Sequence, residues 1–186
     1  MKVLIVGAGG RCHAIALALS KSKYVSEIYC APGNAGIAQI ATLVPIKETD
    51  VEALKAFAIK QKIDLTVVGP EMALAAGIVD EFNAAGLKIF GPTKKAAEIE
   101  TSKSYAKDLM KKYHIPTASY EVFTDYEKAI NYVRGHSLPI VLKYDGLAAG
   151  KGVVIATTLE EAEETLKDML IDEEFGSSSV VIEDYL

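Results

Sequence analysis

The chain has 186 residues, of which half are hydrophobic, and a formal net charge of −5. This length allows one large or two small domains, and the acidic balance argues against a protein that binds nucleic acid mainly by electrostatic attraction. No apolar run approaches the roughly 20 residues that a membrane-spanning helix needs. The first apolar run, residues 3–6, stops at Gly7, which is too early for a signal peptide, so we expect a strand there and a cytoplasmic protein.

Cysteine and histidine are too few and too scattered to predict a disulfide framework or a metal site. Cys12 and Cys30 fall in different expected elements, and the three histidines show no metal-ligand spacing.

Strand and helix patterns alternate through the first hundred residues. Apolar runs predict strands at residues 2–6, 27–30, 44–46, 64–68 and 88–90, and the stretches between them predict helices at 11–20, 50–60 and 73–85. This alternation is typical of a parallel α/β sheet. Ligands of such sheets bind at the carboxyl ends of the strands, and the glycine- and proline-containing loops 7–10, 32–34 and 69–71 all fall at those ends.

The first of these loops favours a phosphate over a dinucleotide. Cys12 stands where a dinucleotide fingerprint needs glycine or alanine, and no acidic residue ends the second strand. The amides of Gly9 and Gly10, with Arg11 beside them, fit a phosphate at a helix N-terminus. A turn that only packs the first helix is the alternative. Ordinary turn chemistry could likewise explain the loops that hold Asn34 and Glu71.

The second half predicts helices at residues 94–113, 125–135 and 159–170 and strands at 119–123, 139–142, 153–156 and 179–182. The first helix should break near residues 100–101, with Thr101 or Ser102 as the N-cap of its second part. Lysines 103, 107, 111 and 112 would then lie mostly on a solvated helix face. A boundary near residue 100 separates this half from the first.

Two lysines and a glycine-rich loop follow one another in Leu138–Ala156, between two expected strands. Glycine lets backbone amides approach an anion closely, and each lysine adds a mobile positive charge. This stretch predicts a flap over nucleotide phosphates, although an ordinary glycine-rich hairpin would look the same. It is not a Walker loop, because strand residues follow Lys151-Gly152. The residues that would carry the flap are Lys143, Asp145, Gly146, Gly150, Lys151 and Gly152.

These motifs together, and in this order, resemble the phosphoribosylamine–glycine ligase (glycinamide ribonucleotide synthetase) family of ATP-grasp enzymes. The resemblance covers all 186 residues and corresponds to the amino-terminal portion of the family. It rests on residues 7–14, Pro32-Gly33-Asn34, Gly69-Pro70-Glu71, Ser102-Lys103 and residues 143–152.

The resemblance implies a domain organisation. Residues 1–100 would form a Rossmann-like, pre-ATP-grasp substrate-binding domain. Residues 101–117 would begin the ATP-grasp domain and link it, and residues 118–186 would form its small α+β lid, with the domain incomplete at the carboxyl end. A last strand that runs into the partly polar residues 183–186 also suggests a fragment.

The resemblance also implies a reaction. The family joins glycine to 5-phosphoribosylamine in purine biosynthesis, forms glycyl phosphate on the way, and cleaves ATP to ADP and phosphate with Mg²⁺ or Mn²⁺. Its partners would be small molecules, with neither nucleic acid nor a membrane. Metal ligands are expected beyond Leu186, so the isolated chain should be inactive as a ligase.

Site residues follow from the same resemblance. Lys103 and Lys143 match the lysines that contact ATP phosphates, and Gly146, Gly150, Lys151 and Gly152 belong to the loop that closes over them. Glu183 and Leu186 match the hinge that recognises adenine. Gly9, Gly10, Arg11, Asn34, Glu71 and Asp145 would bind the substrate, with the 5-phosphate on the first loop.

Two residues depart from the family pattern: Cys12 replaces a glutamate, which puts phosphate affinity in doubt, and Tyr144 replaces a small residue, which could alter the packing of the lid. Three other functions remain open. They are a sibling ATP-grasp carboxylate–amine ligase, a nicotinamide-dependent oxidoreductase, and a catalytically incomplete domain that binds a nucleotide or phosphosugar.

Overall fold

The computed structural model describes residues 1–148, 150–172 and 179–186. The chain divides into two compact units, Met1–Ala97 and Glu98–Leu186. Within the described ranges, none of the helices combines the length and the apolar character needed to cross a membrane.

The first unit is built on a parallel sheet of five strands. These are β1 (Lys2–Gly7), β2 (Glu27–Pro32), β3 (Thr42–Leu43), β4 (Leu65–Val68) and β5 (Ile89–Phe90). Their order is β3-β2-β1-β4-β5, and every neighbouring pair is parallel. The predicted α/β class is confirmed.

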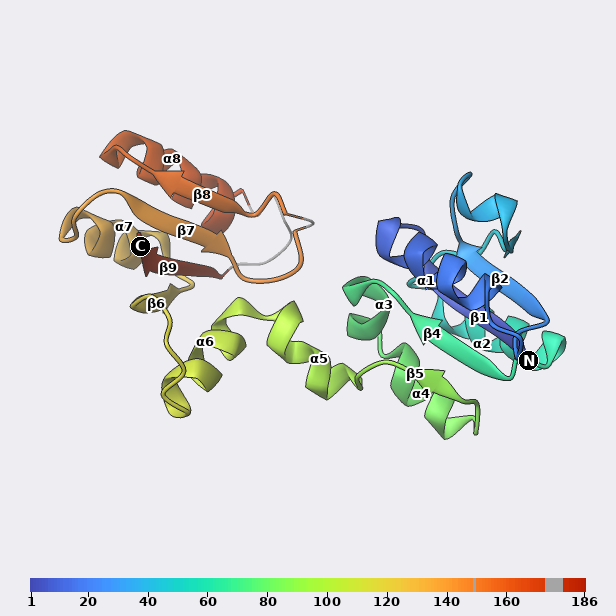
Figure 1. Ribbon diagram of the computed structural model, residues 1–186. Coiled ribbons are helices and arrows are strands. Elements are labelled where there is room, and N and C mark those ends of the chain that lie inside the picture. Colours follow the sequence, from blue (N-terminus) through green and yellow to red (C-terminus); the bar gives the residue numbers. More distant parts are fainter. Residues whose placement is uncertain (149, 173–178) are drawn as a thin grey trace. The chain divides into compact units, whose positions relative to one another are not determined.

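Helices cover both faces of this sheet (Figure 1). They are α1 (Gly10–Ser20), the 3-10 helix η1 (Ile37–Gln39), α2 (Val51–Gln61), α3 (Glu71–Ala75) and α4 (Ile78–Ala84). Because side chains alternate along a strand, Leu4 packs with α2, α3 and α4, whereas the adjacent Ile5 packs with α1 and η1. The buried β1 therefore carries two apolar cores, one on each face.

Two sequence predictions for this unit are wrong. The third strand lies at Thr42–Leu43 rather than residues 44–46, because Ile46 N donates back to Val44 O at 2.8 Å and turns the chain away. The single helix expected at residues 73–85 is two helices, α3 and α4. Gly77 separates them with a φ of +86°, a left-handed value that no helix continues through.

The second unit holds an antiparallel sheet of four strands beside two connected helices. The helices are α5 (Lys94–Thr101), which begins at the end of the first unit, and α6 (Lys103–Lys112). The strands are β6 (Tyr120–Phe123), β7 (Ile140–Tyr144), β8 (Val153–Ala156) and β9 (Val180–Asp184), in the order β6-β9-β7-β8. Ser102 caps α6 by accepting from Tyr105 N, which confirms the predicted helix break.

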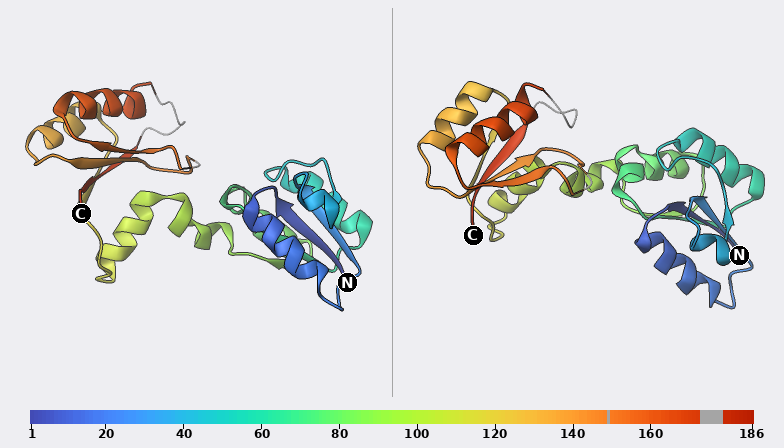
Figure 2. Two further views of the ribbon diagram at one scale, coloured as in Figure 1. Left: turned by 45° about the horizontal axis from the view of Figure 1, so that its top comes forward. Right: turned by 90° about the horizontal axis from the view of Figure 1, so that it is seen from above.

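One face of the second sheet is covered by α7 (Tyr126–Arg134) and α8 (Leu159–Leu170), which lie side by side (Figure 2). Ile140, Leu142 and Tyr144 of β7 point into this core with Ile182 of β9. The alternate residues of β7 and β9 therefore belong to the other face, which these two helices leave free.

Candidate functional site

The face of the second sheet that α7 and α8 do not cover carries charged side chains from its two central strands, β7 and β9. Lys143 of β7 is paired in register with Val181 of β9, so Glu183 lies two residues further along β9 on the same face. Such diagonal neighbours are within reach of each other when their side chains are long. Lys143 Nζ lies 2.8 Å from Glu183 Oε1.

Glu183 is 5% exposed and has two lysine partners rather than one. Lys107 Nζ of α6 lies 2.8 Å from Glu183 Oε2 and also donates to Thr117 Oγ1 at 2.6 Å. The assignment of Lys107 to a solvated helix face is therefore wrong, since only 8% of Lys107 is exposed. Spacing gives no sign of this, because Lys111 lies on the same face of α6, four residues after Lys107, and is exposed.

Asp145, directly after β7, holds the first turn of α6. Its Oδ1 accepts hydrogen bonds from Lys103 N at 2.6 Å, Ser104 N at 3.1 Å and Ser102 Oγ at 3.4 Å, and its Oδ2 accepts from Ser104 Oγ. The carboxylate thus caps a helix more than forty residues away in sequence. A contact of Asp145 with substrate stays a prediction.

Lys103 lies against the start of the flap. Its Nζ donates to Gly146 O at 2.6 Å and lies 6.0 Å from the centroid of the Tyr144 ring. Burial lowers the pKa of the Lys103 ammonium below its ordinary value of 10.5, while Asp145 raises the pKa and the like charge of Lys143 lowers it further. Lys103 Nζ, hydrogen-bonded to Gly146 O, therefore lies at the end of β7 that carries Lys143.

Tyr144, which the sequence marked as a departure that could alter packing, fits the core of the second unit. It is buried with the apolar residues beneath α7 and α8. A Cβ added at Gly146 would meet Tyr144 Cε1 at 2.9 Å, and one added at Gly152 would meet Tyr144 Cβ at 3.1 Å. The tyrosine thus occupies space that the two glycines of the loop leave open.

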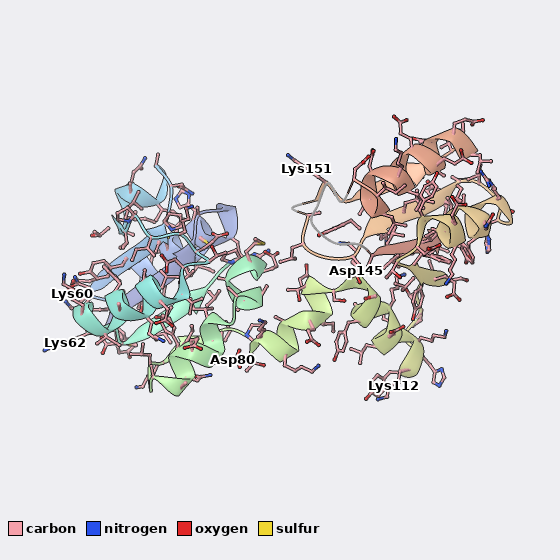
Figure 3. The ribbon with its side chains drawn as sticks, turned by 180° about the vertical axis from the view of Figure 1, so that it is seen from behind. Lys60, Lys62, Asp80, Lys112, Asp145 and Lys151 are labelled. Carbon is pink, nitrogen blue, oxygen red and sulfur yellow. The ribbon has the colours of Figure 1, made fainter. Side chains whose placement is uncertain are left out.

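The rest of the predicted flap forms a hairpin between β7 and β8. The two strands pair antiparallel, Tyr144 N donates to Gly152 O at 2.9 Å, and Lys151 N donates to Ala148 O at 2.9 Å. Gly150 and Lys151 are exposed, and the Lys151 side chain projects away from the sheet, whereas Asp145 lies at α6 (Figure 3). Residue 149, within the same loop, lies outside the described residues.

The two predicted hinge residues have different surroundings. Glu183 is buried between its lysines, whereas Leu186 is 92% exposed. A role of either residue at adenine stays a prediction.

In the first unit, side chains tie together the three loops at the carboxyl ends of the strands. Arg11 Nη1 donates to Gly69 O at 2.6 Å, and Arg11 Nη2 lies 3.2 Å from Glu71 Oε1. Asn34 Nδ2 donates to Ala8 O at 2.6 Å. The structure therefore brings Arg11, Asn34 and Glu71 to one edge of the sheet, as the loop positions predicted.

Space is open above the start of α1. A Cβ built at Gly9 or Gly10 would meet no heavy atom within 4 Å. The pKa of the Glu71 carboxyl is lowered from its ordinary 4.5, chiefly by the hydrogen bond of its own backbone N–H. Burial raises this pKa, and the Arg11 guanidinium lowers it further. An open helix start beside a guanidinium suits a phosphate group chemically.

Cys12 is buried beneath this loop. A Cβ added at Gly7 would meet Cys12 Sγ at 2.6 Å, and one added at Gly69 would also collide with that sulfur. Burial raises the pKa of the Cys12 thiol. Cys12 thus acts as a packing residue between two glycines.

Comparison with known proteins decides the family. Residues 1–100 match the model described as "Phosphoribosylglycinamide synthetase, N domain", and residues 101–186 match "Phosphoribosylglycinamide synthetase, ATP-grasp (A) domain". The chain belongs to the phosphoribosylglycinamide synthetase family. It is 56% identical over its whole length to a phosphoribosylamine–glycine ligase of Halalkalibacterium halodurans and 53% identical to that of Salmonella typhi. It spans 44% of the length of each of these relatives.

Solved structures of the phosphoribosylglycinamide synthetase family agree with this assignment. The phosphoribosylamine–glycine ligase of Thermotoga maritima matches with a TM-score of 0.79 and 35% identity, covering the whole of this chain and 44% of its own. The biotin carboxylase domain of 2-oxoglutarate carboxylase from Hydrogenobacter thermophilus, solved with MgADP, matches with a TM-score of 0.77 and 17% identity, covering the whole of this chain and 44% of its own. This second likeness shows the fold alone.

Proposed function

We propose that this chain forms the amino-terminal part of an ATP-dependent phosphoribosylamine–glycine ligase of purine biosynthesis. The full-length protein would join glycine to 5-phosphoribosylamine in the cytoplasm and give glycinamide ribonucleotide, ADP and phosphate. The observation that carries the proposal is that Lys103, through Gly146 O, and Lys143, near the end of β7, are both held at the base of a glycine-containing hairpin.

The second unit would bind ATP. Lys103 and Lys143 would contact its phosphates, and Gly146, Gly150, Lys151 and Gly152 would form the loop that closes over them. The exposed Lys151 supplies a further positive charge at the tip of the hairpin. Glu183 and Leu186 would contribute the hinge beside the adenine.

The first unit would bind phosphoribosylamine. The open amides of Gly9 and Gly10 would receive the 5-phosphate, with Arg11 balancing its charge. Glu71 would then face the ribose hydroxyls, since Arg11 holds its carboxylate at 3.2 Å. Asn34 would fix the first loop through its bond to Ala8 O.

These residues would act by positioning and by neutralising charge. Transfer of the γ-phosphoryl group to the glycine carboxylate gives glycyl phosphate, which the ribosylamine nitrogen then attacks. Phosphoryl transfer of this kind depends mainly on aligned reactants and on cations at the developing charge. Two lysines tethered to a rigid sheet and to a capped helix meet that need, because neither must be reorganised during the reaction.

The metal ion expected for the reaction, Mg²⁺ or Mn²⁺, needs a cluster of ligands. Residues 1–148, 150–172 and 179–186 hold no group of three or more histidine, cysteine, aspartate or glutamate side chains that could bind a metal ion. We assign no step of the reaction to a metal on this chain, and we propose that the metal ligands lie in the remainder of the full-length ligase.

Phosphate release by the full-length protein tests the proposal. We expect release to require ATP, glycine, phosphoribosylamine and Mg²⁺ together. Replacing Lys143 with methionine should lower kcat/KM at least about 100-fold, whereas the same change at the exposed Lys128 of α7 should leave it nearly unchanged. Activity with another carboxylic acid but not with glycine would overturn the assignment and favour a sibling ligase.

For the isolated chain we propose binding without turnover, because it spans 44% of its relatives' length. Calorimetric titrations with ATP and with ribose 5-phosphate separate the two expected sites. Arg11→Ala should weaken ribose 5-phosphate binding alone, and Lys143→Met should weaken ATP binding alone. A loss of both ligands in either variant would contradict two separate sites.

A further inference from the structure

Lys107 is a buried charge that none of the roles above uses. In the part of the chain that the structure describes, the buried charged residues are Lys107 and Glu183, which are 8% and 5% exposed. Charged side chains are rarely buried this far unless they are paired. The two lie in elements far apart in sequence, α6 and β9, so their pairing is a feature of the fold.

The position of Lys107 is fixed from three sides. Its Nζ lies 2.8 Å from Glu183 Oε2, donates to Thr117 Oγ1 at 2.6 Å, and lies 5.7 Å from the centroid of the Tyr120 ring. The other carboxylate oxygen, Oε1, lies 2.8 Å from Lys143 Nζ without the alignment of a hydrogen bond. One carboxylate therefore stands between two ammonium groups.

We propose that Lys107 is a positioning residue that sets the free positive charge and the orientation of Lys143 through Glu183. This inference rests on the proposed function, in which Lys143 binds the phosphates of ATP. Lysine 107, glutamate 183 and lysine 143 together carry a net charge of +1. Because Lys107 shares the carboxylate, Lys143 is not fully neutralised and keeps N–H donors for a ligand.

Without Lys107 the charge balance among the side chains around Glu183 changes. The net charge of Glu183 and Lys143 is then zero, and the buried carboxylate has a single counter-charge left. Lys143 is drawn toward both carboxylate oxygens and presents less positive charge to a polyphosphate. One unit charge about 10 Å from an anion, at an effective dielectric constant of about 20, changes affinity roughly tenfold.

The experiment compares variants of the full-length protein by steady-state kinetics. Lys107→Met should raise the KM for ATP about tenfold and leave the KM for glycine unchanged. Adding Glu183→Gln restores a net charge of +1 at Lys143, so the double variant should recover a lower KM for ATP than Lys107→Met alone. A general loss of stability would instead lower kcat by reducing the active fraction, without this selective change.

Lys111→Met is the matched control. Lys111 lies one turn further along α6, is exposed, and lies 5.8 Å from the centroid of the same Tyr120 ring. It should keep the wild-type KM for ATP. If Lys107→Met does not fold, Lys107→Gln removes the charge but keeps a donor for Glu183 and Thr117, and it should raise the KM for ATP in the same way.

The outcomes separate the two proposals. An active wild-type ligase in which the Lys107 variants match Lys111→Met would overturn the positioning role and leave the function standing. A wild-type protein that does not use ATP would remove the proposed function itself.

Discussion

Replacing Asp145 with alanine should destabilise the second unit more than the loss of an ordinary helix cap. The carboxylate accepts two backbone N–H groups and two hydroxyls around the first turn of α6. Loss of a helix cap costs about 1 kcal/mol, and each hydrogen bond to a charged group contributes about 1.5–3 kcal/mol. Because Asp145 is only half-buried and Ser102 still caps Tyr105 N, we expect a total of about 3 kcal/mol rather than the full sum.

Asp125→Ala is the natural comparison. Asp125 caps α7 in the same unit through one backbone bond, from Lys128 N at 2.9 Å. It should cost about 1 kcal/mol. Asp145→Asn should fall between the two, since its amide oxygen can still accept from Lys103 N while its NH₂ cannot accept from Ser104.

Urea unfolding followed by far-UV circular dichroism gives the free energies, and hydrogen exchange shows where stability is lost. Exchange should accelerate in the first turn of α6 for Asp145→Ala and in α7 for Asp125→Ala. The reasoning would be refuted if Asp145→Ala cost no more than Asp125→Ala, or if the amides of α6 kept their protection.

Two further predictions concern the first unit. Gly69→Ala should lower the free energy of unfolding in urea by about 2–3 kcal/mol, because the new methyl group collides with Cys12 Sγ. Adding Cys12→Ala should recover at least half of that loss, and no recovery would exclude the sulfur as the cause. The lowered pKa of Glu71 means that its contribution to stability is complete above the ordinary carboxyl pKa near 4.5 and is lost as the pH falls through its lower folded-state value. Glu71→Gln should therefore flatten the acid limb of the melting temperature measured between about pH 6 and pH 3. An unchanged limb would show that the ionised Glu71 carboxylate does not contribute to stability.

Local sequence patterns predicted most of the elements because local signals and tertiary packing agree there. The helix Leu159–Leu170 has its predicted bounds, since Thr158 caps it and two glutamates occupy its first turn. The strand Val153–Ala156 also has its predicted bounds. The helix expected at residues 73–85 failed at Gly77, whose positive φ was available only from the structure.

The site could be predicted only in part. Lys103 and Lys143 could be proposed from their motifs, because each stands in a recognisable local setting: a helix N-terminus and the strand before a glycine-rich loop. The involvement of Lys107 and the capping role of Asp145 depend on contacts between distant elements. No periodicity within α6 or β7 specifies such a contact, so the sequence does not distinguish the buried Lys107 from the exposed Lys111.

The strand order of the second sheet has a consequence for folding during synthesis. β9, which is made after the other three strands of this sheet, lies in the interior of the sheet between β6 and β7. Among the strands that the structure describes, β6 pairs with β9 alone, so it waits for this partner while α7, β7, β8 and α8 are made. The parallel sheet of the first unit is complete once residue 90 has left the ribosome, so the first unit can fold much earlier. Because Glu183 arrives with β9, Lys107 and Lys143 gain their shared counter-charge only as the antiparallel sheet closes.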